Sequence, residues 1–416
     1  MSLLPSLTDG SRGWRRVAMT VGPGLMVMLA DTDAGSVITA AQSGAQWSYQ
    51  LLILQVLIVP ILFAVQELTV RLGLATGKGF GELVLLRFGR LWATLSMATL
   101  VVSCFGALVT EMSGLAGVGQ MFGVPVWQTI SLLVALILAM VCTGSYHSVE
   151  RIAIVFGLFE LAFLVVAWKA HPNSGEILAD VRHVPLTDSG YLYLLAANLG
   201  TSIMPWTVFY QQSALIGKGL TTEHIKLARI DTFVGAVLCQ TVTAAVLVAA
   251  AATIGRQEHG VSLDSVPDIA HAFTLVLGDN VGRVIFALGL SGGALVATIV
   301  VCLTSAWAVG EMTGFRHSLE RHPFGARWFY AAFAVTLIGG GLLVASGINL
   351  VQLSIATGVI NALLLPVVLG FLYLLARKAL PPAYRLTGLY AKVVGLLFLM
   401  TAGLGLYAGI FGALGG

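Results

Sequence analysis

The sequence predicts an all-α transmembrane protein with about eleven spans, built from two inverted copies of five spans, each of which begins with a broken helix. The first observation is composition: 57% of the 416 residues are hydrophobic, 10% are charged and the mean hydropathy is +0.92, whereas soluble domains carry about 25% charged residues. The second is a series of apolar runs long enough to cross a bilayer as helices. The third is an interruption in the first run and another in the sixth.

The apolar runs occupy almost the whole chain and leave only short connections. The expected spans are approximately 17–43, 50–74, 93–120, 127–144, 151–169, 190–214, 230–254, 281–311, 327–346, 350–376 and 389–413. We expect one transmembrane domain, 1–416, with an N-terminal segment at 1–16, one repeat at 17–169, the other at 190–376 and a final span. The connection 255–280 has the apolar spacing of a short interfacial helix. A single domain of this kind argues against a membrane-anchored enzyme.

Basic residues predict the orientation, because cytoplasmic loops retain Lys and Arg. With the N-terminus inside, all but four of the 22 basic residues fall on the inner side; the exceptions are Lys169, Arg182, Arg256 and Arg283. We therefore expect an integral protein of a bacterial plasma membrane with a cytoplasmic N-terminus and an external C-terminus. The net charge of +3 reflects this topology and gives no indication of a nucleic-acid partner.

The first interruption is the stretch MLADTDAGSVITAAQSG, residues 28–44. Asp and Gly are poor helix formers, so DTDAG predicts a break within the first span. Such a break survives at membrane depth only where it lines a cavity or a ligand site. Ionised Asp31 and Asp33 would cost at least ~2.5–3.5 kcal/mol each and require a bound metal ion, sodium or protons. The alternative, open for both, is an acid at a helix end that is protonated or paired with an Arg.

The second interruption, ANLGTSIMPWTVFYQQSA at 197–214, comes five spans later. Gly200 and Pro205 bracket TSIM, and Pro205 removes a backbone donor and frees a carbonyl upstream. Breaks in spans 1 and 6 are expected where inverted copies bring their broken first helices together at the midplane. Met204 is either a packing residue or, beside a carboxylate, a thioether ligand that favours softer transition metals over Mg²⁺ and Ca²⁺.

Over nearly its full length the chain resembles the Nramp family of divalent-metal transporters, which has the LeuT-type fold. DAGS, Asp33 to Ser36, stands where the family has DPGN in its first helix, and Thr201 to Pro205 matches the family's Ala-x-x-Met-Pro break in the sixth. QELTVRLGLATGKGFGEL, 66–83, is similar to the end of the second helix and the following loop. ARIDTFVGA, around Asp231, is similar to the start of the seventh.

The resemblance implies a site for a divalent metal ion, which is the transported substrate. Asp33 would be its anionic ligand, Met204 its sulfur ligand and the Thr201 carbonyl a backbone oxygen ligand. Ser36 stands where the family has Asn, so a shorter hydroxyl, acting through water, replaces an amide oxygen. Asp31 adds a carboxylate near the break.

The family's proton route is altered in this sequence. Glu111, in VTEMSG, matches a family glutamate, and its role is open between a proton acceptor and a protonated packing residue. Trp206 stands where the family usually has His, and Leu108 where it usually has Asp. We therefore expect weak or absent proton coupling. The pattern resembles the Nramp-related branch, which includes magnesium transporters, although those lack the sulfur ligand. Gln211 and Asn361 are further candidates to line the pathway.

Three functions stay open. The first is import of a divalent metal by alternating access, with Mn²⁺ favoured, Fe²⁺ and Cd²⁺ as further substrates and Mg²⁺ as the alternative. The second is a LeuT-type carrier of a small organic solute. The third is an intramembrane aspartyl protease, which fits poorly because its acids must come from separate helices. The sequence contains no Walker A or HExxH motif, so we expect no nucleotide site, catalytic zinc or cofactor, and we expect a monomer. The four cysteines are interpreted as packing residues.

Overall fold

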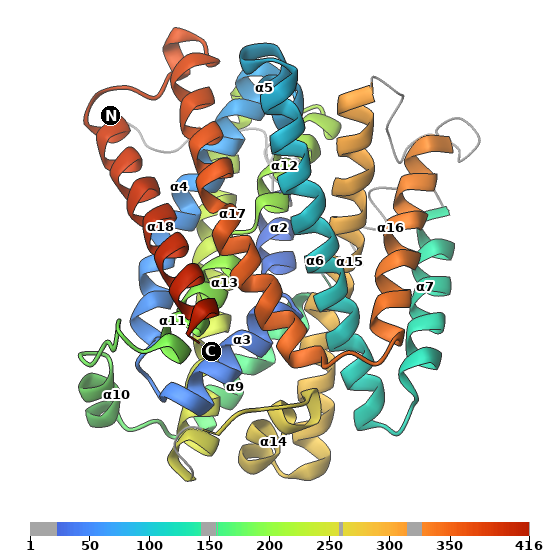
Figure 1. Ribbon diagram of the computed structural model, residues 1–416, viewed down its shortest axis with the longest axis vertical. Coiled ribbons are helices and arrows are strands. Elements are labelled where there is room, and N and C mark those ends of the chain that lie inside the picture. The colour runs from blue at the N-terminus through green and yellow to red at the C-terminus, as the bar shows by residue number, and fades with distance from the viewer. Residues whose placement is uncertain (1–22, 143–154, 156, 258–260, 314–326, 416) are drawn as a thin grey trace, which may run out of the picture.

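The computed structural model describes residues 23–142, 155, 157–257, 261–313 and 327–415. Regular secondary structure in these residues is entirely helical (Figure 1). The α-helices are α2 (Pro23–Asp31), α3 (Ala34–Trp47), α4 (Leu52–Thr76), α5 (Phe80–Phe88), α6 (Arg90–Met121), α7 (Val126–Cys142), α9 (Ala162–Lys169), α10 (Ser174–Asp180), α11 (Ser189–Ser202), α12 (Pro205–Gly217), α13 (Ile225–Gln257), α14 (Val266–Leu277), α15 (Asp279–Thr313), α16 (Arg327–Ala345), α17 (Leu350–Lys378) and α18 (Gly388–Leu414). The 3-10 turns are η1 (Leu158–Leu161), η2 (Thr222–His224) and η4 (Pro382–Tyr384).

Both helix breaks lie where the sequence predicts them. The first span divides into α2 and α3, because Asp33 adopts an extended conformation (φ −86°, ψ −179°) and caps α3. The sixth span divides into α11 and α12 at Met204, which is also extended (φ −87°, ψ 138°). Pro205 occupies the first turn of α12, where its missing N–H costs no intrahelical hydrogen bond.

Seven described helical segments are long and apolar enough to cross a membrane: Leu52–Thr76, Arg90–Met121, Ser189–Gly217, Thr222–Arg256, Asp279–Ala308, Leu350–Lys378 and Gly388–Leu414. The other expected spans correspond to shorter or interrupted helices: α2 with α3, α7, α9 and α16. The expected N-terminal segment 1–16 lies outside the described residues, as do 17–22, 143–144, 151–154 and 156, which are parts of the expected first, fourth and fifth spans.

Two short helices display the inverted relation between the halves of the chain. α5 lies between α4 and α6, and α14 lies at the corresponding place between α13 and α15. They sit at opposite ends of the molecule (Figure 1), which we call the α5 end and the α14 end. Helix α14 confirms the helix expected within 255–280, whereas α5 and α10 fall in segments that we expected to be loops. Each has fewer than ten residues, too few for a clear helical period.

The broken helices form the centre of the bundle. In the segment Ser189–Gly217, which contains α11 and α12, 94% of an 18-residue apolar stretch is buried inside the molecule. The corresponding fraction is 33% in α18, which lies at the periphery of the bundle. Small residues allow this close packing. A β-carbon on Gly200 would lie 1.8 Å from the Gly358 carbonyl oxygen of α17, and one on Gly44 would lie 2.3 Å from that of Leu247 in α13.

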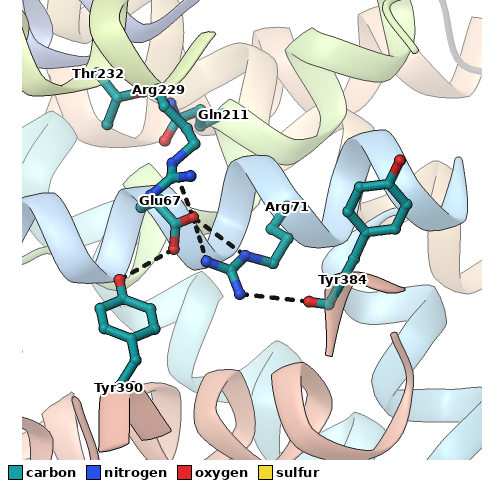
Figure 2. Close-up of polar contacts among 7 residues, drawn as sticks. All are labelled: Glu67, Arg71, Gln211, Arg229, Thr232, Tyr384 and Tyr390. Carbon is teal, nitrogen blue, oxygen red and sulfur yellow. Dashed lines mark hydrogen bonds and ion pairs between the residues drawn. The ribbon is translucent and has the colours of Figure 1, made fainter. Parts of the chain in front are cut away.

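A buried ion-pair network joins helices near the α5 end (Figure 2). Glu67 of α4 is fully buried and pairs with Arg71 at 2.5 Å and with Arg229 of α13 at 3.1 Å. The Tyr390 hydroxyl of α18 donates to the second carboxylate oxygen of Glu67 at 3.3 Å. Arg71 also donates to the Tyr384 carbonyl at 3.4 Å. Because α4, α13 and α18 meet at one carboxylate and Arg71 joins η4 to it, we assign this network to the stability of the bundle.

Candidate functional site

The first break places a buried carboxylate at the start of a helix. Asp33 is 2% exposed, and its Oδ1 accepts from the Ser36 N–H at 2.7 Å. The backbone N–H of Ala34 is directed elsewhere: it donates to Glu111 Oε2 of α6 at 3.0 Å. The positive end of α3 therefore faces two acids, and the Asp33 and Glu111 side chains interact with each other. Two acids in this setting favour an arriving cation.

Ser36 connects the two breaks. Its hydroxyl lies 2.8 Å from the Asp31 carbonyl oxygen at the end of α2 and 3.2 Å from the Thr201 carbonyl oxygen in the last turn of α11. A carbonyl near a helix end has lost its intrahelical donor and is available to a side chain or a ligand. The structure thus brings together three of the predicted site residues, Ser36, Asp31 and Thr201, beside the Asp33 carboxylate.

Met204 begins the second half of the other broken helix. Its side chain is 2% exposed, and its sulfur accepts from the Trp206 indole N–H at 3.1 Å. Its carbonyl accepts from the Thr207 hydroxyl at 2.8 Å. Trp206 is therefore a donor to the predicted sulfur ligand. A thioether held in this way keeps a second lone pair for another partner.

Asp31 contributes differently from Asp33. Its carboxyl is fully buried and its Oδ2 lies 3.8 Å from the Cys239 thiol of α13. Its Oδ1 makes no hydrogen bond within the described residues. Cys239 was interpreted from the sequence as a packing residue, and the structure instead places it against an acid 208 residues earlier in the chain. No local pattern around Cys239 signals this contact.

Gln211 and Asn361 occupy separate places. Gln211 of α12 donates to the Thr232 hydroxyl at 3.0 Å and lies beside the Glu67 network (Figure 2). Asn361 of α17 is 1% exposed and neither its amide oxygen nor its nitrogen is hydrogen bonded within the described part of the chain. Asn361 lies one helical turn after Gly358 in α17. Gly358 packs against the second break, because a β-carbon there would lie 2.9 Å from the Thr201 side chain. Asn361 is therefore the candidate nearer to the second break.

The donor set is poor in charged ligands. No group of three or more His, Cys, Asp or Glu residues suited to a metal ion occurs in the described ranges. The breaks instead offer the capping carboxylate of Asp33, the carboxylate of Asp31, backbone carbonyls, a hydroxyl and a thioether.

Comparisons of the sequence with known proteins point to one family. The model of the family described as natural resistance-associated macrophage protein-like (Nramp) matches residues 24–410. The divalent metal cation transporter MntH of Verminephrobacter eiseniae is 24% identical over 395 residues, which cover 90% of this chain and 85% of that protein. The metal transporter Nramp3 of Oryza sativa subsp. japonica is 28% identical over 215 residues, 49% of this chain and 38% of that protein. The chain thus spans well under half of the rice relative's length.

Comparison of the structures supports the same fold. A crystal structure of a mutant manganese transporter of Eremococcus coleocola superimposes with a TM-score of 0.73 at 16% identity, covering 97% of this chain and 87% of that one. Mhp1, a nucleobase-cation-symport-1 family transporter, gives a TM-score of 0.60 at 15% identity, with 95% and 91% covered. The predicted LeuT-type fold is confirmed.

Proposed function

Because the chain belongs to the Nramp family, a family of transporters and not of enzymes, we propose that it imports divalent metal ions by alternating access around its two broken helices. The family's bacterial members include proteins named as divalent metal cation transporters. Broken helices that face each other at the midplane provide a binding site which rigid-body movement exposes to one side and then to the other.

The observation that carries this proposal is the contact between the breaks. Ser36 lies within hydrogen-bonding distance of a carbonyl from each of them, and Asp33 supplies a buried charge at the same place. We propose Asp33, Met204, the Thr201 carbonyl, Ser36 and Asp31 as the metal site. Glu111, Gln211, Asn361 and Trp206 are proposed to line the pathway around it.

We propose Mn²⁺ as the favoured ion, with Fe²⁺ and Cd²⁺ as further substrates. A thioether adds favourable covalency with these ions and contributes little to Mg²⁺ or Ca²⁺. One observation favours Mg²⁺ as the alternative: the Ser36 hydroxyl is engaged by two carbonyls and the Met204 sulfur by Trp206. A site whose ligands are partly occupied suits an ion that keeps several of its waters, as Mg²⁺ does.

We further propose that proton coupling is weak or absent and that the chain belongs to the divergent, Nramp-related branch. Glu111 has Leu108, not an acid, one turn earlier in α6, and Trp206 is not titratable. A proton taken up at Glu111 then lacks the two neighbours that would pass it on. The chain is proposed to act as a monomeric transport domain in a bacterial plasma membrane, with the α5 end in the cytoplasm.

Uptake into proteoliposomes tests the proposal. Purified full-length protein is reconstituted, and Mn²⁺, Mg²⁺ and Ca²⁺ are offered singly and in competition while internal pH is recorded. We expect saturable Mn²⁺ uptake with little acidification. Uptake of none of these ions, from vesicles that contain folded protein, would contradict the proposed function.

A further inference from the structure

The α5 end of the molecule carries three exposed cations without an acidic partner. Arg87 lies in the last turn of α5, Arg90 begins α6 and Lys378 ends α17, and all three side chains are exposed. None of them forms an ion pair or a side-chain hydrogen bond with a residue that the structure describes. The acid of α5, Glu82, pairs instead with Lys78. The positive charge at these helix ends is therefore available to an anion.

An aromatic cluster packs together the three helices that carry these cations. Between ring centroids, Phe371 of α17 lies 5.6 Å from Phe88 of α5 and 5.8 Å from Trp92 of α6. Lys378 follows Phe371 by about two turns, so both lie on the same face of α17. Helix α6 begins, and α17 ends, at the α5 end (Figure 1). Because the two arginines flank Phe88 in the chain, all three cations border this cluster.

The surface next to the cations is apolar and belongs to a membrane-spanning helix. Leu91, Leu95 and Val102 lie on one face of α6 and are exposed by 78%, 42% and 47%. Trp92 stays 48% exposed beside them, although it contacts Phe371. Helix α6 is long and apolar enough to cross a membrane, so these side chains face acyl chains. A tryptophan near basic residues at a helix end is typical of the level of the lipid headgroups.

The ligand that fits this arrangement has a phosphate and an apolar body. A guanidinium can donate two hydrogen bonds to one phosphate, and a lysine adds a positive charge. A soluble phosphate would use the cations alone, whereas a phospholipid also covers the apolar face of α6. Phosphatidylcholine carries its own positive charge, so a lipid with a net negative charge is favoured. Basic pockets between transmembrane helices bind headgroups of this kind.

We propose that Arg87, Arg90 and Lys378 bind the phosphate of an anionic phospholipid, whose acyl chain lies along Leu91 and Leu95 of α6. The bound lipid joins the end of α17 to α5 and α6, because its phosphate contacts cations of all three helices. This site is separate from the helix breaks, so the proposal holds whichever ion the protein transports.

The test places the full-length protein in phosphatidylcholine vesicles that contain a rising fraction of phosphatidylglycerol with brominated acyl chains. Bromine quenches tryptophan fluorescence at short range, and subtracting the signal of Trp92→Phe from that of the unmodified protein isolates Trp92. Trp127, which is 62% exposed at the start of α7 and at the α14 end (Figure 1), is isolated in the same way. We expect half-quenching of Trp92 at a phosphatidylglycerol fraction roughly fivefold or more below that for Trp127, since one basic residue at an anionic surface produces a factor of this size.

Charge variants test the cations against a matched control. Arg90→Gln and Lys378→Gln should each raise the fraction needed to quench Trp92 by roughly fivefold. Lys392→Gln removes an exposed cation at the same end of the molecule, but from α18, which packs on α11, α17 and α4, and it should leave the Trp92 curve unchanged. Each of these side chains is exposed, so the variants should keep the Tm of the unmodified protein in detergent.

Several results would overturn the proposal. One is quenching of Trp92 and Trp127 at the same phosphatidylglycerol fraction. Another is an equal shift of the Trp92 curve in Lys392→Gln, which would mean diffuse attraction to this end of the molecule rather than a site. A third is relief of the quenching by inorganic phosphate at constant ionic strength, which would indicate a site for free phosphate. Brominated phosphatidylcholine should quench the two tryptophans alike, and a preference of Trp92 for this lipid would contradict selection by charge.

Discussion

The Ser36 hydroxyl lies 3.2 Å from the Thr201 carbonyl oxygen, although 165 residues separate the two in the chain. The same hydroxyl lies closer, at 2.8 Å, to the Asp31 carbonyl, so its one proton serves two acceptors from two broken helices. The acceptor that it leaves unsatisfied is available to a cation. Ser36 therefore acts both as a tie between the breaks and as part of the surroundings of the ion.

Ser36→Ala should weaken Mn²⁺ binding by roughly two- to twelvefold, because one hydrogen bond that organises the two carbonyls contributes ~0.5–1.5 kcal/mol. The measurement is calorimetric titration of the purified protein. Ser346→Ala is the control, since that exposed hydroxyl bonds to the Leu343 carbonyl at the end of α16. Unchanged or tighter Mn²⁺ binding by Ser36→Ala would show that the hydroxyl does not organise the site.

Met204→Ala tests ion selectivity through a single atom. If the sulfur is a ligand, Cd²⁺ and Mn²⁺ uptake should fall while Mg²⁺ and Ca²⁺ uptake stays the same or rises, because water fills the vacated position and only the softer ions lose a favoured ligand. Competition uptake into proteoliposomes measures the change in preference.

Trp206→Phe is the matched control for this experiment. It removes the indole N–H that the sulfur accepts and keeps the thioether, so the preference for Cd²⁺ should persist or increase. Equal losses for Cd²⁺ and Mg²⁺ in folded Met204→Ala would count against sulfur coordination and favour a hydrated, oxygen-based site.

Metal uptake should move few protons. We expect the internal pH of proteoliposomes to change little during Mn²⁺ uptake, because Leu108 and Trp206 stand at two positions where a proton relay needs titratable groups. A pH-sensitive dye in the lumen makes the measurement. Stoichiometric acidification that depends on the metal and disappears in Glu111→Gln would establish a relay through that residue and refute the expectation.

Glu67→Gln should destabilise the folded protein by about 3 kcal/mol, because it removes the shared partner of two arginines, one of which, Arg71, is only 13% exposed. The expected observation is a clear fall of the Tm in detergent. Glu176→Gln breaks an ion pair whose members are 47% and 36% exposed, so its Tm should change little. Similar Tm values for the two variants would mean that the Glu67 network does not stabilise the bundle.

Local features of the sequence were sufficient for the two breaks and for most of the helices. Asp33 separates two helices and caps the second, and Pro205 favours the first turn of a helix; both follow from the chemistry of single residues. Helices α5 and α10 could not be predicted in this way. They have nine and seven residues, too few turns to show the repeat of apolar residues that identifies a helix.

Contacts between distant residues had no local signal. In the sequence, Asp231 is only one residue of the motif ARIDTFVGA. In the structure its carboxylate accepts a hydrogen bond from the Gly24 N–H, 207 residues earlier, at 2.8 Å and so caps the start of α2. The sequence predicts Cys239 to be a packing residue, and only the three-dimensional arrangement places it beside the first break. Which polar groups of separate helices meet depends on their register, and the sequence pattern leaves that register open.

The most direct test of the central claim is Mn²⁺ binding by Asp33→Ala, measured by calorimetry on purified protein whose Tm and gel-filtration profile match those of the unmodified chain. Asp33 supplies the charge at the break that offsets dehydration of the ion, so binding should be lost, whereas Asp31→Asn, whose carboxyl faces Cys239, should only weaken it. Near-normal Mn²⁺ binding by folded Asp33→Ala would contradict the account of a metal site at the first break.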